Sequence, residues 1–444
     1  MRHLVVCCDG TWNTPDEEAA TNVYRLHNAL ADTAEDGAEQ LRYYDRGVGT
    51  EGGLADYVLG GAAGAGLSRN VLDAYHWLTT TYQPGDHIAL FGFSRGAYTV
   101  RSLAAMVAAC GLLDTTSLSD AMVWRQIDHV YHRRYQRGDR ASPRHIRHAR
   151  HAVALDERRS PFSPALWDPA PNQDLKQMWF PGSHLDVGGG HREKGLSDGA
   201  LHWMIEQARD TAGLAFHKTT LDQIRPDPLD VLHDDNRIFT GWLAPALNPL
   251  VEPFFAPRPR AVPLIDAPDP SLHESVSKRH QKVPITGGPY RTTRILAAGE
   301  SATVRVHARD PWNWTELYLE PDEYSFTAQG QWVDRTIRSG PEGTTGPRRF
   351  LPTEGLRLLG TLFGRGEMLF RRVIRNWVAD FLFTRREEDL PWMSLVGVVA
   401  NDATEIEREL KVHERIRIGA GTEHRVTKAG YLYAFANDAW GFYG

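Results

Sequence analysis

Ser94 stands between Gly92 and Gly96, in a setting that could make its hydroxyl a nucleophile. An apolar run after a turn, residues 85–91, predicts a buried strand before it. Residues 97–109 carry Ala, Leu, Val and Met at helical spacing and predict a helix after it. A Gly-x-Ser-x-Gly turn between a strand and a helix presents the serine at the C-terminal edge of a sheet. We therefore predict that Ser94 attacks an ester carbonyl. The alternative interpretation is a glycine-bounded turn in which Ser94 only caps the helix.

A negatively charged intermediate would form at the same turn and would need hydrogen-bond donors. Arg95 lies at the predicted start of the helix, where backbone N–H groups have no intrahelical partner. Its N–H can therefore face a developing oxyanion.

The general base and the acid that orients it should follow the serine in the order Ser, Asp or Glu, His. Asp186 is the acid we select, because it follows a predicted strand at residues 177–181 and precedes three glycines that let other loops approach closely. The alternative is that Asp186 only shapes a turn beside those glycines.

The chain has 19 histidines, so the general base must be selected by its position in the sequence. His273 stands in a loop-like context shortly before an apparent domain boundary, where the last catalytic loop of such a fold belongs. His233 is the second candidate. His184 and His191, beside the predicted acid, come next. Chain order narrows this choice without settling it.

Strands alternating with helices predict an α/β fold with a mostly parallel sheet in the first part of the chain. A largely helical insert rich in Arg and His is expected at residues 117–151. The other expected strands are 4–8 and 42–44, and the other expected helices are 70–82 and 196–213.

A second, all-β domain is predicted beyond a Pro-, Gly- and Arg-rich linker at residues 283–292. We place a catalytic domain at 1–285 and a β-sandwich accessory domain at 290–444, with a helical insertion at about 355–384. The sandwich strands are expected at 302–306, 316–320, 324–328 and 431–436.

Two apolar segments raise the question of a membrane surface. Residues 356–383 interleave Leu, Phe and Trp with arginines, as in an amphipathic helix that lies on lipid. The other interpretation is an insertion packed on the sandwich. Residues 242–257, apolar and broken by prolines, are a second candidate lid that could border an acyl pocket.

Composition limits the cellular compartment and the classes of partner that we expect. The 444 residues carry a net charge of −6, and the arginine-rich insert is interpreted as a solvated face, so no nucleic-acid partner is expected. Three cysteines cannot form a disulfide framework and favour a reducing compartment. No signal peptide or membrane-spanning stretch is recognised. We expect synthesis in the cytoplasm, with any export by a route that needs no signal peptide.

Several motifs recur together in one known family. Across roughly residues 1–285 the chain resembles the bacterial and fungal α/β-hydrolase family that includes the phospholipase effectors of type VI secretion. The motifs that carry the resemblance are residues 9–13, 21–23, 47–50, 92–98, 156–159, 182–190, 195–198 and 273–276.

The resemblance implies a catalytic triad of Ser94, Asp186 and His273. It also implies that the turn Asp9, Gly10 and Thr11 lies beside the nucleophile and supplies a second oxyanion donor, although Asp9 could equally be a structural anchor. The implied activity is hydrolysis of lipid or phospholipid esters, with a membrane surface and a secretion-system component as expected partners. A non-lipid carboxylesterase and a catalytically silent scaffold are the alternatives.

Residues 312–319 and 430–438 are similar to parts of a calcium-dependent galactose-binding lectin sandwich. Only Asn437 and Asp438 remain as ligands from that likeness, whereas calcium takes about six to eight oxygen ligands. We therefore expect a docking or positioning role for this domain and no cofactor.

Overall fold

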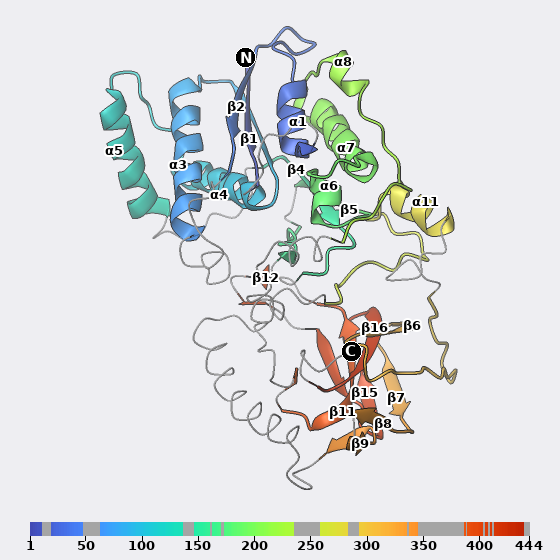
Figure 1. Ribbon diagram of the computed structural model, residues 1–444. Coiled ribbons are helices and arrows are strands. Elements are labelled where there is room, and N and C mark those ends of the chain that lie inside the picture. The colour runs from blue at the N-terminus through green and yellow to red at the C-terminus, as the bar shows by residue number, and fades with distance from the viewer. Residues whose placement is uncertain are drawn as a thin grey trace. The chain divides into compact units, whose positions relative to one another are not determined.

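The computed structural model divides the chain into two compact units, which are described separately (Figure 1). Unit 1 holds Met1–Ala154 and Trp167–His233, and unit 2 holds Leu155–Leu166 and Asp234–Gly444. The structure describes residues 1–10, 19–47, 63–135, 146–159, 162–169, 173–234, 258–282, 293–334, 337–344, 386–387, 389–402, 405–406, 409–410 and 413–438.

The chain passes from unit 1 to unit 2 for the last time between residues 233 and 234, upstream of the predicted linker. That linker, residues 283–292, lies outside the described residues. The division into 1–285 and 290–444 therefore stays a prediction. The two apolar segments 242–257 and 356–383 also lie outside the described residues.

A three-stranded parallel sheet forms the centre of unit 1. Its strands are β2 (Gln40–Asp45), β1 (His3–Cys8) and β3 (His87–Gly92), in that order. Every residue of β1 is buried, as expected of an apolar run in the middle of a parallel sheet. Strand β1 ends level with its neighbours, because Cys8 pairs with Asp45 on one side and Gly92 on the other.

Helices cover both faces of this sheet (Figure 1). Leu4, Val6 and Cys8 pack against one group of helices, and Val5 and Cys7 pack against the other. The first group is α3 (Ala63–Thr81), α4 (Arg95–Cys110) and α5 (Asp120–Val130), and the second is α1 (Asn22–Ala29) and α7 (Gly195–Ala212). The expected combination of parallel strands and helices is confirmed for this unit.

A second parallel pair in unit 1 corrects the prediction for residues 117–151. Helix α5 is followed by a π-helical turn, η2 (Tyr131–Tyr135), but residues 148–151 begin a strand, β4 (His148–Ala154). It pairs with β5 (Asp174–Phe180) along its whole length. Polar residues at the start of β4 hid the strand, because their partners lie on distant segments. Two short helices, α6 (His184–Gly188) and α8 (Lys218–Leu221), complete the unit.

Unit 2 is built mainly from antiparallel strands. Its largest sheet has the order β10 (Glu342–Thr344), β11 (Trp392–Ala400), β16 (Gly430–Ala436) and β6 (Asn313–Leu319), with β14 (Glu414–Arg417) also paired to β11. The remaining elements are the strand pairs β7 (Glu323–Thr327) with β15 (Gly421–Arg425), β8 (Trp332–Asp334) with β9 (Ile337–Ser339) and β12 (Glu405–Ile406) with β13 (Glu409–Leu410), and helix α11 (Glu274–Lys282).

One expected strand of unit 2 is wrong, and β11 is the longest of the described strands that were not predicted. Residues 302–306 alternate in burial, and Ala302, Val304 and Val306 pack against the apolar core, but they form no strand. Strand β11, by contrast, is buried at all nine positions. It shows no polar alternation, which is the pattern by which the other strands were recognised.

Candidate active site

Ser94 occupies a sharp turn between β3 and α4. Its backbone has φ 55° and ψ −121°, a conformation that non-glycine residues rarely adopt. A strained serine between a strand and a helix is the geometry that exposes a nucleophilic hydroxyl. The side chain of Ser94 makes no capping hydrogen bond to α4, which argues against the simple capping role.

Both glycines of the motif are required by close backbone contacts. A Cβ atom on Gly96 would overlap the carbonyl oxygen of Cys8, and one on Gly92 would overlap the carbonyl oxygen of Gly96. The N–H of Phe93 donates to the Cys8 carbonyl at 3.2 Å. The end of β1 is thus pressed against the serine turn.

Arg95 is the first residue of α4. The following amides already have partners, since Gly96 N–H donates to the Phe93 carbonyl at 2.8 Å and Ala97 N–H to the Ser94 carbonyl at 3.0 Å. By its place at the start of α4, the Arg95 amide is the oxyanion donor that the sequence predicts.

Asp9 lies at the end of β1, and its carboxylate is an anchor for this corner of the sheet. It is 1% exposed and accepts hydrogen bonds from the Gly10 N–H at 2.7 Å, the Thr21 hydroxyl at 2.5 Å and the Tyr44 hydroxyl at 2.7 Å. Burial and this hydrogen bond raise the pKa of Tyr44, which keeps its proton on the phenol. Thr11, the last residue of the predicted turn, lies outside the described residues.

Asp186 is buried in the first turn of α6, with 2% of its surface exposed. Oδ2 accepts the N–H and the hydroxyl of Ser183, both at 2.9 Å, in a capping box that fixes the carboxylate. Gly182 has φ 120° and leaves no room for a Cβ beside Asp186. The acid is thus held rigidly by its own loop.

His233 is the imidazole that Asp186 binds in the structure. Nδ1 lies 2.6 Å from Asp186 Oδ1, and the His233 N–H donates to Oδ2 at 3.0 Å. On the opposite side of the ring, Nε2 lies 3.3 Å from Glu193 Oε2, and the ring stacks on His191 with centroids 3.8 Å apart. Burial lowers the pKa of His233, but the hydrogen bond and charge of Asp186, together with Glu193, outweigh it and raise the pKa above its usual value.

Helix α6 is packed directly onto the serine turn. The Phe93 ring, adjacent to Ser94 in the chain, stacks on His184 with centroids 4.6 Å apart. A Cβ on Gly188 would overlap the same ring. Because both ends of this five-residue helix contact Phe93, the acid-bearing loop and the serine turn belong to one packed corner of unit 1.

The motif at residues 21–23 joins this corner to Asp9. Thr21 forms a bridge with Gly189, while its hydroxyl donates to Asp9. The Asn22 amide donates to the carbonyls of Val187 at 3.0 Å and Ser197 at 2.8 Å. Residues far apart in sequence therefore converge at the C-terminal ends of β1 and β3.

His273, the base selected from the sequence, lies in unit 2, immediately before α11. Its Nδ1 lies 2.8 Å from the hydroxyl of Ser275 and 3.3 Å from the Ser275 N–H. Its pairing with Asp186 and Ser94 stays a prediction. Glu193 was missed by sequence reasoning, and its only signal was its place three residues after the glycine run that follows the acid.

Asn437, directly after β16, anchors a neighbouring segment of unit 2. It is fully buried, its amide nitrogen donates to the carbonyls of Glu387, Leu390 and Pro391, and its Oδ1 accepts the Glu387 N–H at 3.0 Å. The side chain therefore fastens the segment before β11. Its oxygen accepts one hydrogen bond, and the expectation of no cofactor stays a prediction.

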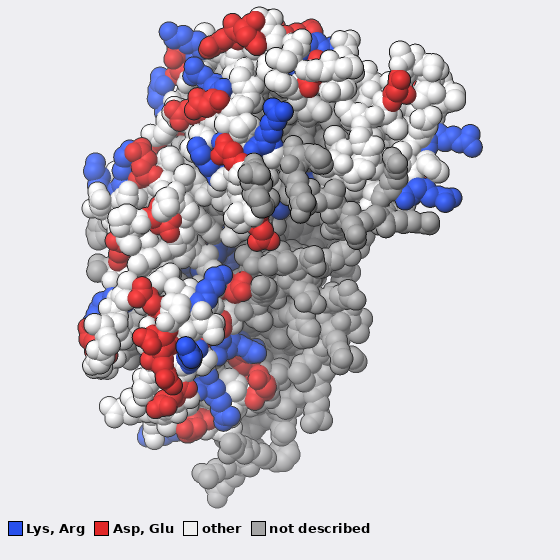
Figure 2. Space-filling model, turned by 180° about the vertical axis from the view of Figure 1, so that it is seen from behind, with Lys and Arg blue, Asp and Glu red and all other residues white. Residues whose placement is uncertain are grey.

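Two features of the described residues concern binding to polyanions and to membranes, namely the distribution of surface charge and the length of the apolar helices. On the face drawn in Figure 2, basic and acidic side chains of the described residues are interspersed, and they form no broad basic patch there. Among the described helices, none is both long enough and apolar enough to cross a bilayer.

Comparison with known proteins finds similarity to a phospholipase effector family of type VI secretion in the first half of the chain. The sequence model of the family described as "T6SS, Phospholipase effector Tle1-like, catalytic domain" matches residues 2–143 and 121–207. An uncharacterized protein of Saccharomyces cerevisiae is 33% identical over 125 residues, which are 25% of this chain and 18% of the yeast protein.

A solved structure of the Tle1 effector bound to the VgrG spike of the type 6 secretion system is 16% identical to this chain. The match covers 43% of this chain and 51% of that chain, with a TM-score of 0.28. In both relatives the similarity is confined to part of the protein.

Proposed function

We propose that the chain is a serine ester hydrolase of α/β-hydrolase type that acts on lipid or phospholipid esters. The observation that carries the proposal is the strained Ser94 turn packed against the loop in which Asp186 binds His233. Nucleophile and oriented imidazole are the parts that acyl transfer requires. Nothing in this proposal calls for a metal or an organic cofactor.

In the proposed reaction, the imidazole removes the proton of the Ser94 hydroxyl while Oγ attacks the ester carbonyl. The Arg95 amide stabilises the oxyanion of the tetrahedral intermediate. The imidazolium then protonates the leaving alcohol, and an acyl-enzyme remains. Water, activated by the same imidazole, releases the carboxylic acid and restores Ser94. Asp186 keeps Nδ1 protonated and stabilises the imidazolium.

We assign the base to His233, because its Nδ1 lies 2.6 Å from Asp186 within the same unit as Ser94. Nε2, which lies 3.3 Å from Glu193 Oε2 in the structure, is the nitrogen that would take the Ser94 proton in this proposal. The family resemblance assigns the base to His273 instead, so the two histidines must be compared by experiment.

The lipid substrate and the secretion-system partner rest on the matching family, whose description names a phospholipase effector of type VI secretion. The apolar segments at 242–257 and 356–383 would suit a lipid surface. A membrane surface and a component of the secretion apparatus are therefore the partners that we propose.

The test combines covalent labelling with turnover of soluble and lipid esters. A fluorophosphonate probe should label the full chain and lose its target in Ser94→Ala, while Ser102→Ala, a control on the same helix, keeps it. Phospholipid vesicles should be hydrolysed faster than small p-nitrophenyl esters. Faster turnover of the small esters would indicate a non-lipid carboxylesterase, and the absence of labelling would indicate a scaffold.

His233→Ala should reduce kcat by several orders of magnitude, whereas His273→Ala should leave most of it. The opposite result would show that the sequence assignment is right and that the Asp186–His233 pair is only structural. Because a triad acts as a unit, Ser94→Ala combined with His233→Ala should be little worse than either change alone.

A further inference from the structure

The motif at residues 195–198 has no part in the proposed reaction, yet it contacts the segment that carries His233. The motif forms the first turn of α7. The segment, residues 225–233, follows α8 and forms neither a helix nor a strand. Because no regular structure fixes this segment, contacts with other parts of unit 1 must hold the imidazole in place.

Two aspartates fasten the segment to α7. Asp198, in the first turn of α7, is 3% exposed, and its Oδ2 accepts the Arg225 N–H at 2.6 Å. Its Oδ1 lies 2.6 Å from Nη1 of Arg25 on α1, an ion pair that fixes the carboxylate. In the opposite direction, Asp230 Oδ2 accepts the Gly195 N–H at 2.8 Å. Each of the two chain segments thus supplies one carboxylate to a backbone N–H of the other.

The Gly195 position has room only for glycine. A Cβ there would lie 2.6 Å from Asp230 Oδ2 and 2.9 Å from the Cβ of Asp227. Backbone N–H groups at the start of a helix have no intrahelical acceptor, and Lys194, the N-cap residue, makes no capping hydrogen bond with its side chain. Asp230 supplies an acceptor from a distant part of the chain, and its negative charge suits the positive end of the helix dipole.

Hydrogen bonds inside the segment continue from this anchor to the imidazole. Asp230 Oδ1 accepts the Val231 N–H at 2.8 Å, so one carboxylate bonds both α7 and its own turn. Two residues later, the His233 N–H donates to Asp186 Oδ2 at 3.0 Å, and Nδ1 lies 2.6 Å from Oδ1. The segment is therefore held by α7 immediately before it reaches the acid.

We propose that Asp198 and Asp230 are positioning residues: by fastening this segment to α7, they set where the His233 imidazole meets Asp186. Their effect on turnover rests on the proposed function, in which this imidazole takes the Ser94 proton. Neither aspartate takes part in that proton transfer. A misplacement of the reacting groups by about 1 Å costs roughly 100-fold in rate.

The position of the ring has a readout that does not depend on turnover. The titratable groups that face His233 are Asp186 from α6 and Glu193 and His191 from the loop before α7. Burial lowers the pKa of His233, but the two carboxylates outweigh burial and raise the pKa. A ring that moves away from them therefore has a lower pKa. General loss of stability reduces the folded fraction but leaves the pKa of the folded protein in place.

The experiment follows His233 by NMR titration of the full chain with ¹⁵N-labelled histidine, and His233→Ala identifies its signal. Asp230→Ala should lower the pKa of His233. It should also move the acidic limb of kcat/KM on a soluble p-nitrophenyl ester to lower pH and reduce kcat roughly 10- to 100-fold. Gly195→Ala should act in the same direction, because its methyl displaces Asp230. Asp230→Asn keeps an oxygen for the Gly195 N–H and should recover most of the loss.

Two matched controls separate the position of the ring from general effects. Gly199→Ala adds a methyl to the same helix at a place where no atom lies within 4 Å. Asp222→Ala removes an exposed aspartate at the end of α8. Both controls should leave the pKa of His233 and the turnover unchanged. Circular dichroism of each variant excludes loss of folding, and Gly195→Ala decides if Asp230→Ala does not fold.

An unchanged pKa of His233 in folded Asp230→Ala and Gly195→Ala would overturn the proposal, even if turnover falls. A lowered pKa with unchanged turnover would keep the positioning role and contradict His233 as the base. If the wild-type chain hydrolyses no ester, the proposed function fails, and the NMR titration still decides whether these contacts position the ring.

Discussion

At the scale of single residues, the members of the candidate site differ in backbone strain, burial and hydrogen bonding. Ser94 carries backbone strain, Asp186 is buried and fully engaged, and His233 remains partly exposed with one nitrogen toward Glu193. The strain of Ser94 is retained because Gly92 and Gly96 let two backbone segments approach it. Packing around these positions therefore supports the chemistry that we propose.

Glu193 should set the pH at which the enzyme becomes active. Its charge contributes to the raised pKa of His233, and a general base works only when unprotonated, so activity is lost as the pH falls through that pKa. Glu193→Gln should lower this pKa and move the acidic limb of the kcat/KM profile to lower pH.

The measurement is a pH–rate profile on a soluble ester, with Glu206→Gln as a control at a carboxylate that pairs with His202 instead. An acidic limb that stays in place in Glu193→Gln would mean that another group, such as His273, is the titrating base.

Gly96→Ala should destabilise the fold. The new methyl would meet the carbonyl oxygens of Cys8 and Asp9, and backbone atoms cannot move aside as a flexible side chain can. We expect a loss of about 1–3 kcal/mol in the free energy of unfolding, measured by urea denaturation.

Gly199→Ala is the matched control for this change. Gly199 lies inside α7, and a Cβ there would have no atom within 4 Å. Alanine should therefore stabilise that helix by roughly 0.5–1 kcal/mol. A loss of stability at both positions would show that the overlap at Gly96 is not the cause.

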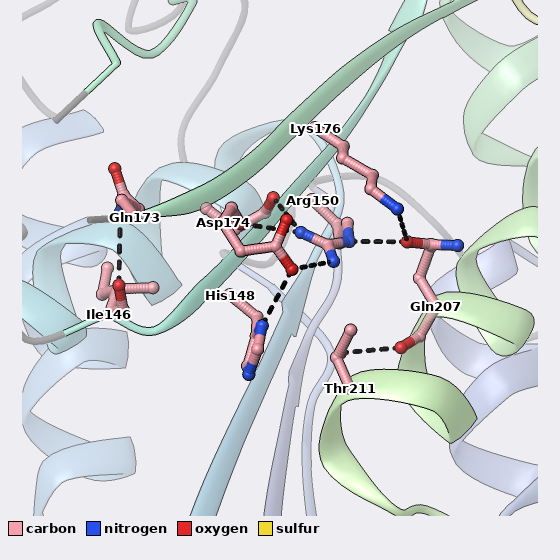
Figure 3. A network of polar contacts seen from close by, with 9 residues as sticks. Ile146, His148, Arg150, Gln173, Asp174, Lys176, Gln207 and Thr211 are labelled. Carbon is pink, nitrogen blue, oxygen red and sulfur yellow. Dashed lines mark hydrogen bonds and ion pairs between the residues drawn. The ribbon is translucent and has the colours of Figure 1, made fainter. Parts of the chain in front are cut away.

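At the scale of secondary-structure elements, β4 and β5 are tied to α7 by the polar network of Figure 3. Arg150 on β4 donates to Asp174 Oδ2 at 2.5 Å and to the Gln207 side chain on α7 at 2.7 Å. His148 Nδ1 lies 2.9 Å from the same Asp174 oxygen. These contacts give the polar start of β4 its partners.

The sequence predicted elements with local patterns better than elements with distant partners. The β3 strand, the serine turn and α4 were all predicted, because an apolar run, two glycines and helical spacing stand side by side in the chain. Strand β4 was missed because Arg150 and His151 look like solvated residues until β5 and α7 supply their hydrogen bonds. His233 was only the second candidate for the base for a similar reason, since chain order does not encode which loop reaches the acid.

Asp174→Asn should lower the free energy of unfolding at neutral pH but not in strong acid. Hydrogen bonds from Arg150 and His148 lower the pKa of Asp174 to about 2. A carboxylate with a depressed pKa stabilises the fold above its ordinary pKa, near 3.8, and this contribution disappears as the pH falls through about 2.

The stability difference between wild type and Asp174→Asn should therefore be constant above about pH 5 and shrink steadily below about pH 4. Its size will be modest, because the Asp174 side chain is 42% exposed and solvent screens it. Thermal unfolding across this pH range tests the prediction, with Asp210→Asn on α7 as the control. A difference that does not change with pH would assign the effect to packing.

At the scale of the whole molecule, spatial units and chain order do not coincide. The segment Leu155–Leu166, between β4 and β5, belongs to unit 2. Within that unit, the Arg258 N–H donates to the Arg158 carbonyl at 2.9 Å and Arg260 donates to the Phe162 carbonyl at 2.7 Å. The composition of residues 283–292 predicts a linker from the local sequence alone. Long-range hydrogen bonds such as those of Arg258 and Arg260 help to determine which segments belong to one unit.

The segment 356–383 gives the intact molecule its predicted means of reaching lipid. It lies outside the described residues, and its expected role follows from arginines interleaved with Leu, Phe and Trp. The double change Trp377→Ser and Phe381→Ser should reduce binding to phosphatidylglycerol vesicles about tenfold or more, because each large side chain loses apolar burial. Soluble-ester turnover should stay unchanged.

Val333→Ser, at an exposed apolar residue of β8, is the control in the same cosedimentation assay. Undiminished vesicle binding in the double variant would mean that these two side chains do not enter the lipid and that the segment packs on the protein instead.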